Sequence, residues 1–189
     1  LGTLAQFMAV VTGTTLFHGL VILPLFLWLF TRVSPLQFWR GARPALLTAF
    51  ATSSSAATLP ITLNCLQQEL KVSPQVSGSV APLGAQLNMD GTALYEATAA
   101  LFVANLVGLD LSLGQELIIC LTVMLASIGA PGIPSAGMVT MVMVLQSVGL
   151  PAEAVAILLP IDRLLDTVRT MVNVEGDMVT SLIVDKYSA

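Results

Sequence analysis

Five polar side chains recur along the last helical segment that the sequence predicts, residues 162–177. At about 3.6 residues per turn, their spacing places all five within an arc of roughly 80° on one helix face. They are Asp162, Asp166, Arg169, Asn173 and Asp177. The residues around them are mostly apolar, and a charge at the centre of a bilayer costs about 2.5–3.5 kcal/mol on insertion scales. We therefore expect this stripe to hold a polar ligand.

A second polar cluster interrupts an earlier apolar segment at residues 88–92, which read NMDGT. Asn, Asp and Gly are poor helix formers and favour local turns. An acid with such neighbours in mid-membrane is typical of an unwound helix whose carbonyl groups and carboxylate face a cation. The sequence therefore predicts a cation-binding break here.

Several of these side chains have a structural alternative. Glu96 lies one turn beyond the break, and because burial disfavours the charged form of a carboxyl group, it is either a proton carrier or a hydrogen-bonded structural acid. Asp162 either serves binding or braces its helix, for example by pairing with Arg163. Asp166 and Arg169, at positions i and i+3, either bind a ligand or satisfy each other.

Two further motifs interrupt apolar runs with residues that do not continue helices. Residues 52–60 read TSSSAATLP, and residues 127–137 read SIGAPGIPSAG. Apolar arms flank each motif, and arms of roughly 15 residues are too short to cross a bilayer easily. Two short arms that meet at a polar tip indicate a re-entrant hairpin, whose irregular backbone must be buried or line a cavity. The serines of the first motif either bind a ligand or cap the hairpin.

The composition indicates an integral membrane protein. Mean hydropathy is +0.89, and charged residues make up only 10% of the chain, against about 25% in a soluble domain. No basic cluster suggests a nucleic-acid partner, and no nucleophile–base pair or catalytic metal set suggests an enzyme. Arginines near Trp28 and Trp39 are typical of a membrane interface, which we expect to be cytoplasmic.

These observations predict an all-α membrane protein with two re-entrant helical hairpins and an unwound central helix. Paired interrupted segments are also the best sequence indication of a transporter binding site. The expected order is a transmembrane helix at 4–31, a hairpin at 36–70, a broken helix at 75–108, a hairpin at 113–148 and the polar-striped helix at 151–187.

The four motifs, in this order, resemble the glutamate transporter family, the sodium/dicarboxylate symporters. The resemblance implies a homotrimer in the lipid bilayer, in which each protomer has a scaffold and a transport domain that moves like an elevator. This sequence resembles only the C-terminal part of the transport domain. We expect the N-terminal scaffold to be absent from residues 1–189, so that the sequence is a fragment or obtains its scaffold from elsewhere.

The resemblance also implies a substrate site between the two hairpin tips. Asp166 is expected to bind an amino group, and Arg169 to bind a side-chain carboxylate through its planar fork. Side chains of Thr92, Thr170 and Asn173 are implied as hydrogen-bond partners. Backbone groups are implied at Ser53, Ser55, Ile133 and Gly137.

Three sodium sites are implied, with the oxygen ligands that hard cations prefer. The first uses carbonyl groups of Gly84, Asn88 and Asn173 with the Asp177 carboxylate. The second uses Asp90 with Asn88 and resembles a site that needs a further helix. The third uses carbonyl groups of Ser127, Ile128, Ala130 and Gln86. Glu96 matches the position of a glutamate in proton-exchanging family members.

The implied function is secondary active symport of an acidic amino acid, aspartate or glutamate, with sodium and with or without protons. No cofactor is expected besides these coupled ions, and the implied location is multi-pass in the plasma membrane. The alternatives are a C4-dicarboxylate symporter, a non-transporting fragment and an anion-conducting channel. Ser53 and Thr167 stand where acidic amino acid carriers often have a second arginine, so Arg169 is expected to act alone.

Overall fold

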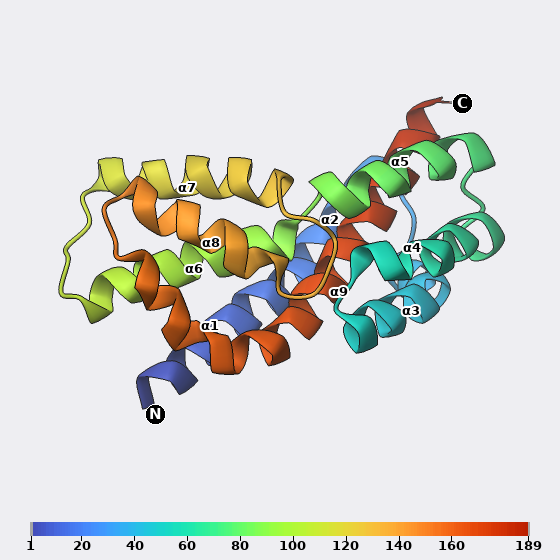
Figure 1. The fold of residues 1–189 in the computed structure, drawn as a ribbon. Helices are drawn as coiled ribbons and strands as arrows, with labels where there is room; N and C mark the ends of the chain where they lie inside the picture. Colours follow the sequence, from blue (N-terminus) through green and yellow to red (C-terminus); the bar gives the residue numbers. More distant parts are fainter. Residues whose placement is uncertain (1, 189) are drawn as a thin grey trace.

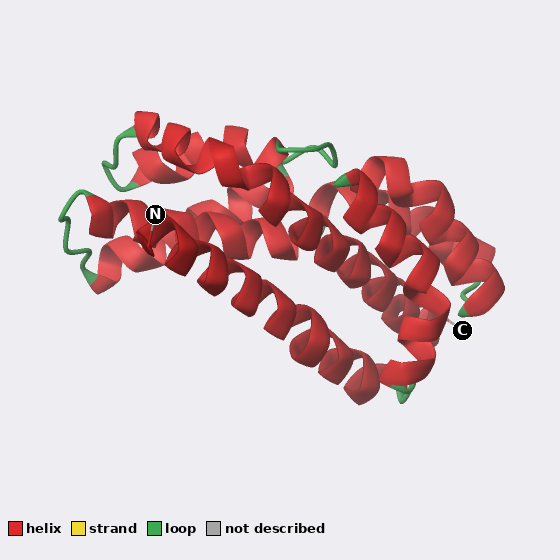
Figure 2. Cartoon of the chain, turned by 90° about the horizontal axis from the view of Figure 1, so that it is seen from below, coloured by secondary structure: helices red, strands yellow, loops and turns green. Residues whose placement is uncertain are grey.

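The computed structural model describes residues 2–188, and every regular element within them is helical. Helices account for nearly the whole chain, and short loops join them (Figure 2). The predicted all-α fold class is confirmed.

The N-terminal segment is one continuous helix, Gly2–Thr31, and it is mostly apolar. It consists of α1 (Gly2–Phe17), a π-helical turn (His18–Ile22) and α2 (Leu23–Thr31). It is the one helix among residues 2–188 whose length and apolar composition suit a full membrane crossing. The helix ends at Arg32, which has a left-handed φ of 64° and places its guanidinium 4.8 Å from the Trp28 ring centre.

The first hairpin consists of α3 (Pro35–Thr52) and α4 (Ser55–Asn64), the latter continued by a π-helical turn (Cys65–Glu69). Only residues 53–54, the first tip, leave the helical conformation. The irregular segment is therefore shorter than the polar motif of residues 52–60, since Pro60 lies inside α4. The Ser54 hydroxyl accepts a bond from the Ala57 amide at 3.1 Å, and this N-cap restarts the helix at once.

The second hairpin consists of α7 (Leu113–Ile128) and α8 (Ala136–Ser147), joined by residues 129–135, the second tip. A reciprocal capping box between Ser112 and Gln115 begins α7. The tip is again shorter than the motif, because Ser127 and Gly137 are helical.

The broken helix consists of α5 (Pro74–Leu87) and α6 (Asp90–Leu106). Its break is confined to residues 88–89, so Asp90 already begins α6, where its carboxylate suits the positive end of the helix dipole.

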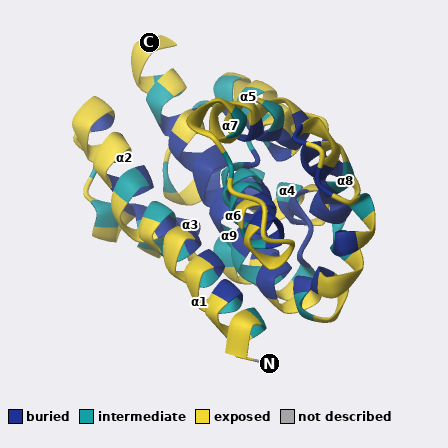
Figure 3. Cartoon of the chain, turned by 90° about the vertical axis from the view of Figure 1, so that its left-hand side faces the viewer, coloured by how far each residue is buried: buried dark blue, intermediate teal, exposed yellow. Residues whose placement is uncertain are grey.

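The polar-striped helix is α9 (Val155–Ser188), preceded by a short 3-10 turn (Ala152–Ala154). It packs against α1, α2, α3, α5 and α6, and all five residues of its polar stripe are buried. It therefore forms the axis of the molecule, and in Figure 3 the buried residues gather around it while α1 and α2 expose their outer face.

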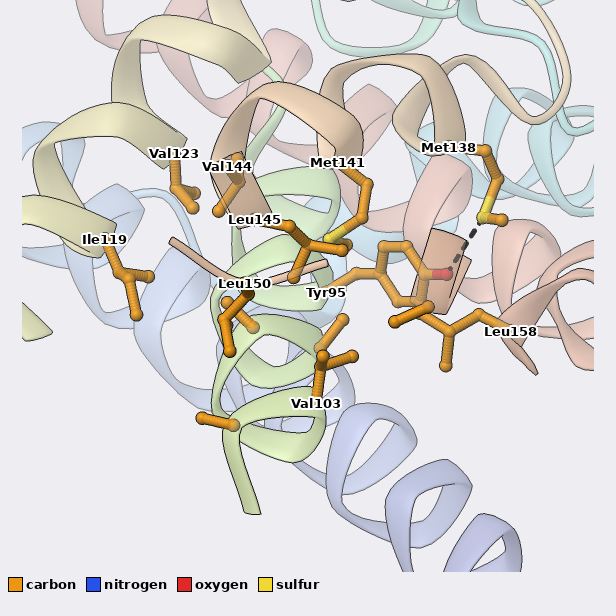
Figure 4. Packing of buried hydrophobic residues seen from close by; sticks show 14 of the residues in the cluster. Tyr95, Val103, Ile119, Val123, Met138, Met141, Val144, Leu145, Leu150 and Leu158 are labelled. Atoms are coloured by element: carbon orange, nitrogen blue, oxygen red, sulfur yellow. Dashed lines mark hydrogen bonds between the residues drawn. The ribbon is translucent and has the colours of Figure 1, made fainter. Parts of the chain in front are cut away.

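The two hairpins enter from opposite ends and meet in the middle. In Figure 1 the first hairpin lies at the right-hand end beside the C-terminus, and the second lies at the left-hand end. Each end has its own apolar core. One core unites α1, α6, α7 and α8, and Figure 4 shows part of its packing around Tyr95 and Met141. The other unites α2, α3, α5 and the C-terminal half of α9. The tips and the break of the central helix meet between these cores.

Large apolar side chains remain exposed on the outer helices. Examples are Leu25 and Phe26 on α2, and Leu121 and Leu125 on α7. Many exposed apolar side chains of this kind are typical of contact with lipid or with another part of a membrane protein.

Candidate functional site

A small pocket lies between the two hairpin tips, the break of the central helix and α9. Apart from Arg169, every predicted substrate-binding residue lines it. The lining comprises Ser53, Ser55, Met89, Thr92, Ala130, Pro131, Gly132, Ile133, Ala136, Gly137, Asp166, Thr170 and Asn173. The tertiary structure thus brings together residues from four separate stretches of sequence.

Direct hydrogen bonds join the two tips. The Gly132 carbonyl accepts a bond from the Ser54 hydroxyl at 2.7 Å and from the Ala56 amide at 3.1 Å. A Cβ added to Gly132 would lie 2.7 Å from the Ala85 carbonyl oxygen, so the tip approaches the end of α5 too closely for a side chain. The second tip therefore lies over the pocket and against the first tip.

Asp166 links α9 to the second tip. Its Oδ2 accepts a bond from the Ser135 amide at 2.8 Å, and its Oδ1 accepts one from Arg169 Nη2 at 2.8 Å. Ser135 adopts a left-handed φ of 59°, a conformation that non-glycine residues rarely adopt. The Asp166 carboxylate thus holds a strained turn of the tip in place.

Arg169 is fully buried behind the pocket, at 1% exposure. Its guanidinium stacks 3.9 Å from the Tyr95 ring centre. Its Nη2 also lies 2.9 Å from Asp162 Oδ1, and this ion pair does not have the geometry of a hydrogen bond. Asp162 therefore pairs with Arg169, two turns along α9, rather than with Arg163, which is exposed.

Arg169 also bonds to Asp166, but this pair does not use up its donors. Nε and Nη1 of Arg169 have no protein partner. Nη1 lies near the pocket, 3.8 Å from where a Cβ on Gly137 would be. Buried guanidinium donors without partners are costly, and they suit a ligand carboxylate.

Asn173 fastens the start of α6 to α9. Its Oδ1 accepts a bond from the Gly91 amide at 2.7 Å, and its Nδ2 donates to Thr92 Oγ1 at 3.2 Å. A Cβ on Gly91 would lie 2.6 Å from the Arg169 carbonyl oxygen, so the two backbones are in direct contact. This close packing holds the broken end of the central helix beside the pocket.

The residues predicted for the first sodium site lie together. A Cβ on Gly84 would lie 2.5 Å from Asp177 Oδ1, and Asn88 Nδ2 donates to the same oxygen at 3.3 Å. The Asp177 carboxylate is buried, and among residues 2–188 the Asn88 side-chain amide is the one hydrogen-bond donor to it. A buried carboxylate of this kind suits a hard cation such as sodium.

The residues predicted for the second site lie side by side over Gly176. A Cβ there would lie 2.6 Å from Asn88 Nδ2 and 3.1 Å from Asp90 Oδ2. Asp90 Oδ2 also lies 3.1 Å from His18 Nε2, on the N-terminal helix.

The residues predicted for the third site lie at the end of α7 and on α5. Ser127, Ile128 and Ala130 surround the point where α7 gives way to the second tip, and Ser127 O accepts a bond from the Ala130 amide at 3.2 Å. Gln86 follows Ala85, which the second tip contacts at Gly132. This brings both parts of the proposed ligand set to one region.

Glu96 is completely buried between α6 and α8. Its Oε1 accepts a bond from the Thr140 hydroxyl, whereas its Oε2 has no hydrogen-bond partner. The predicted proton carrier is therefore an acid with half of its acceptor capacity unused.

Several residues at this site were not predicted from the sequence. Gly132 and Ser135 lie in the predicted second tip and Thr140 lies beyond it, but their partners depend on the meeting of two hairpins. Glu175 is also buried and accepts a bond from Trp39 Nε1 at 2.9 Å. Its place between Asn173 and Asp177 in an apolar helix was a signal that could have identified it.

Comparisons with known proteins agree with this geometry. Residues 1–187 match the model of the sodium:dicarboxylate symporter family. Over 185 residues the chain is 51% identical to excitatory amino acid transporter 3 of Mus musculus, covering 98% of this chain and 35% of that protein. It is 49% identical over 185 residues to an excitatory amino acid transporter of Caenorhabditis elegans, covering 98% of this chain and 37% of that protein.

A third relative is excitatory amino acid transporter 1 of Rattus norvegicus, which is 48% identical over 187 residues, or 99% of this chain and 34% of that protein. The chain spans about a third of the length of these curated relatives. The family resemblance read from the motifs is confirmed, and the chain belongs to the sodium:dicarboxylate symporter family of integral membrane transporters.

Proposed function

We propose that this chain is the transport-domain core of a secondary active symporter that binds an acidic amino acid, aspartate or glutamate, together with sodium. The observation that carries the proposal is the pair of Asp166, which lines the pocket between the two tips, and Arg169, which is buried behind it. The relatives named as excitatory amino acid transporters support the same substrate class.

The two charges select the substrate in complementary ways. The Asp166 carboxylate suits the ammonium group that every amino acid has. The unpartnered nitrogens of Arg169 suit the additional carboxylate that only acidic amino acids have. On binding, the Asp166–Arg169 pair would be replaced by a pair of Asp166 with the substrate ammonium and a pair of Arg169 with the substrate carboxylate. No charge would then be left unpaired in the apolar surroundings.

Sodium would bind next to this site rather than within it. Asn173 borders the pocket, and Asp177 follows it one turn later among the proposed cation ligands. A cation there would neutralise buried acids and hold the broken end of the central helix in place. Such shared elements couple the two binding events, and the coupling is reciprocal.

Glu96 is the proposed proton carrier. It is a buried acid beside the substrate site, and its Oε2 lacks a partner. Protonation removes the cost of burying its charge.

The intact protein is proposed to be a homotrimer in the plasma membrane, with a scaffold against which this core moves. Basic residues at one end favour a cytoplasmic location for that end. Arg32 lies between α2 and α3, Lys71 between α4 and α5, and Lys186 in the last turn of α9.

Competition binding in sodium tests the proposed function. Aspartate and glutamate should displace labelled aspartate from the intact protein, whereas succinate, which has no ammonium for Asp166, should compete poorly. Equal competition by succinate would instead identify a dicarboxylate symporter. Uptake that follows the sodium gradient, rather than a passive ohmic current, would exclude an anion channel as the main activity.

A further inference from the structure

One side chain, Thr140, forms the hydrogen bond between Glu96 and the second hairpin. Thr140 lies on α8, the inner arm of that hairpin, and its hydroxyl donates to Glu96 Oε1 on α6. The two residues are 44 positions apart in sequence, and both are buried. No other hydrogen bond to the Glu96 carboxyl group exists among residues 2–188.

Thr140 has a second acceptor within reach. Its Oγ1 lies 3.2 Å from the carbonyl oxygen of Gly137, and Gly137 lines the pocket. A threonine hydroxyl has one hydrogen to donate and lone pairs that accept. Thr140 can therefore donate either to Glu96 or to the backbone at the pocket, but not fully to both.

Few charges compete with Thr140 for Glu96. Neither α1 nor α8 contains an ionisable side chain, and Glu116 of α7 is exposed in its first turn. From α9, Arg169 is the nearest cation, and it is paired with Asp162 and Asp166. Tyr95, the neighbour of Glu96, donates its hydroxyl to Met138 Sδ at 3.2 Å (Figure 4). Asp90 lies at the first residue of α6, where it pairs with His18.

We propose that Thr140 is a positioning residue that transmits the protonation state of Glu96 to the second hairpin at Gly137. This inference rests on the proposed role of Glu96 as a proton carrier. With Glu96 ionised, the Thr140 hydroxyl donates to the carboxylate. When Glu96 takes a proton from solution, its acidic hydrogen donates to Thr140 Oγ1, and the threonine hydrogen turns to the Gly137 carbonyl. One proton enters and stays on Glu96, and only hydrogen bonds are exchanged.

The consequence is that protonation adds a bond at the start of α8, next to the tip that covers the substrate. The protonated state thereby favours the closed hairpin, and the ionised state favours its release. Substrate affinity is then expected to fall as pH rises through the titration of Glu96.

The test measures sodium-dependent aspartate affinity of the intact protein between pH 5.5 and 9 in four single variants and in the double variant Thr140→Val with Glu96→Gln. Thr140→Val removes the donor and nearly keeps the volume, whereas Thr140→Ser keeps the donor. Thr98→Val is a matched control, since the Thr98 hydroxyl bonds only to Leu94 O within α6. Glu96→Gln removes the titrating group itself.

In Thr140→Val no hydrogen bond links Glu96 to the Gly137 carbonyl, so the protonation state of Glu96 no longer reaches the second hairpin. Aspartate affinity should therefore lose most of its dependence on pH between 5.5 and 9. Thr140→Ser and Thr98→Val should keep the unmodified profile. Thr140→Val should have no effect on the already flat profile of Glu96→Gln.

The possible failures are distinguishable. A pH profile that survives in Glu96→Gln would remove Glu96 as the proton carrier, and with it the proton part of the proposed function. A flat profile in Glu96→Gln combined with an unchanged pH profile in Thr140→Val would overturn the Thr140 inference alone. If Thr140→Val binds no aspartate at any pH, Thr140→Cys replaces it, and its weak S–H donor should leave only part of the pH dependence. An unchanged pH profile in Thr140→Cys also overturns the inference.

Discussion

At the residue scale, the proposed substrate site is built from charges that pair with one another. Arg169 contacts two acids and an aromatic ring, yet two of its nitrogens remain without partners. Asp166 is shared between Arg169 and the second tip. We expect an acidic amino acid to pair its ammonium with Asp166 and its side-chain carboxylate with the unpartnered nitrogens of Arg169, whereas a neutral amino acid has no side-chain carboxylate for Arg169.

Arg169→Thr should therefore weaken binding of acidic substrates. Loss of one partner of a desolvated charge pair costs about 2–5 kcal/mol, so aspartate affinity should fall by roughly thirtyfold to several thousandfold. Serine binding should change much less or improve. Competition assays would measure both, with Arg163→Thr as an exposed control on the same helix. Unchanged aspartate affinity would show that another group holds the substrate carboxylate.

Gly84→Ala tests the first sodium site by steric means. The added methyl group would lie 2.5 Å from Asp177 Oδ1 and would displace the carboxylate. Overpacking costs about 1–3 kcal/mol, so the sodium concentration for half-maximal aspartate binding should rise by roughly fivefold or more. Gly78→Ala is the matched control, because a Cβ there has no neighbour within 4 Å. An equal response in the two variants would remove Asp177 from the sodium site.

At the element scale, two hairpins that enter from opposite ends depend on each other at their tips. The Gly132 carbonyl lies at the N-terminus of α4, where free amide groups and the Ser54 hydroxyl are available. One carbonyl of the second tip thus completes the cap of a helix in the first hairpin. Closure of the pocket and order in α4 are coupled for this reason.

Ser54→Ala should loosen this contact. It removes both the N-cap of α4 and the 2.7 Å bond to Gly132, and caps alone contribute about 0.5–2 kcal/mol. Aspartate dissociation should accelerate by roughly two- to thirtyfold, which a filter-binding chase would measure. Ser79→Ala removes a hydroxyl that bonds only within α5, and it should leave the dissociation rate unchanged. Equal rates in both variants would contradict a role for the tip contact.

At the scale of the whole molecule, two apolar cores flank a polar centre. Each core packs one hairpin against a different half of α9. The pocket and the proposed cation ligands lie where the cores meet, so a ligand there contacts both halves at once. Binding of one ligand should therefore organise the site for the next.

Sodium should consequently tighten substrate binding in the intact protein. Affinity for aspartate measured in sodium and in choline should differ by more than about tenfold, since the coupling free energy acts on both ligands. Titration calorimetry in each salt gives the two values, and aspartate should tighten sodium binding by the same factor. Equal affinities in the two salts would remove sodium from the proposed function.

The sequence by itself determined the class of the molecule and the composition of its site. Low charge content indicated a membrane protein, and the spacing from Asp162 to Asp177 placed five polar groups on one helix face. Both inferences rest on local properties, since hydropathy and helical periodicity do not depend on what packs nearby. The positions of the two tips and of the helix break were predicted for the same reason. Their lengths were overestimated, because caps such as Ser54 restart a helix sooner than composition suggests.

Only the tertiary structure decided which groups meet. Ser135 reaches Asp166 across 31 residues, Thr140 reaches Glu96 across 44, and Trp39 reaches Glu175 across 136. Asp162 pairs with Arg169 rather than with its neighbour Arg163, because one helix face is buried and the other is exposed. Such partners depend on how separate helices pack, and no local pattern in the chain specifies that packing.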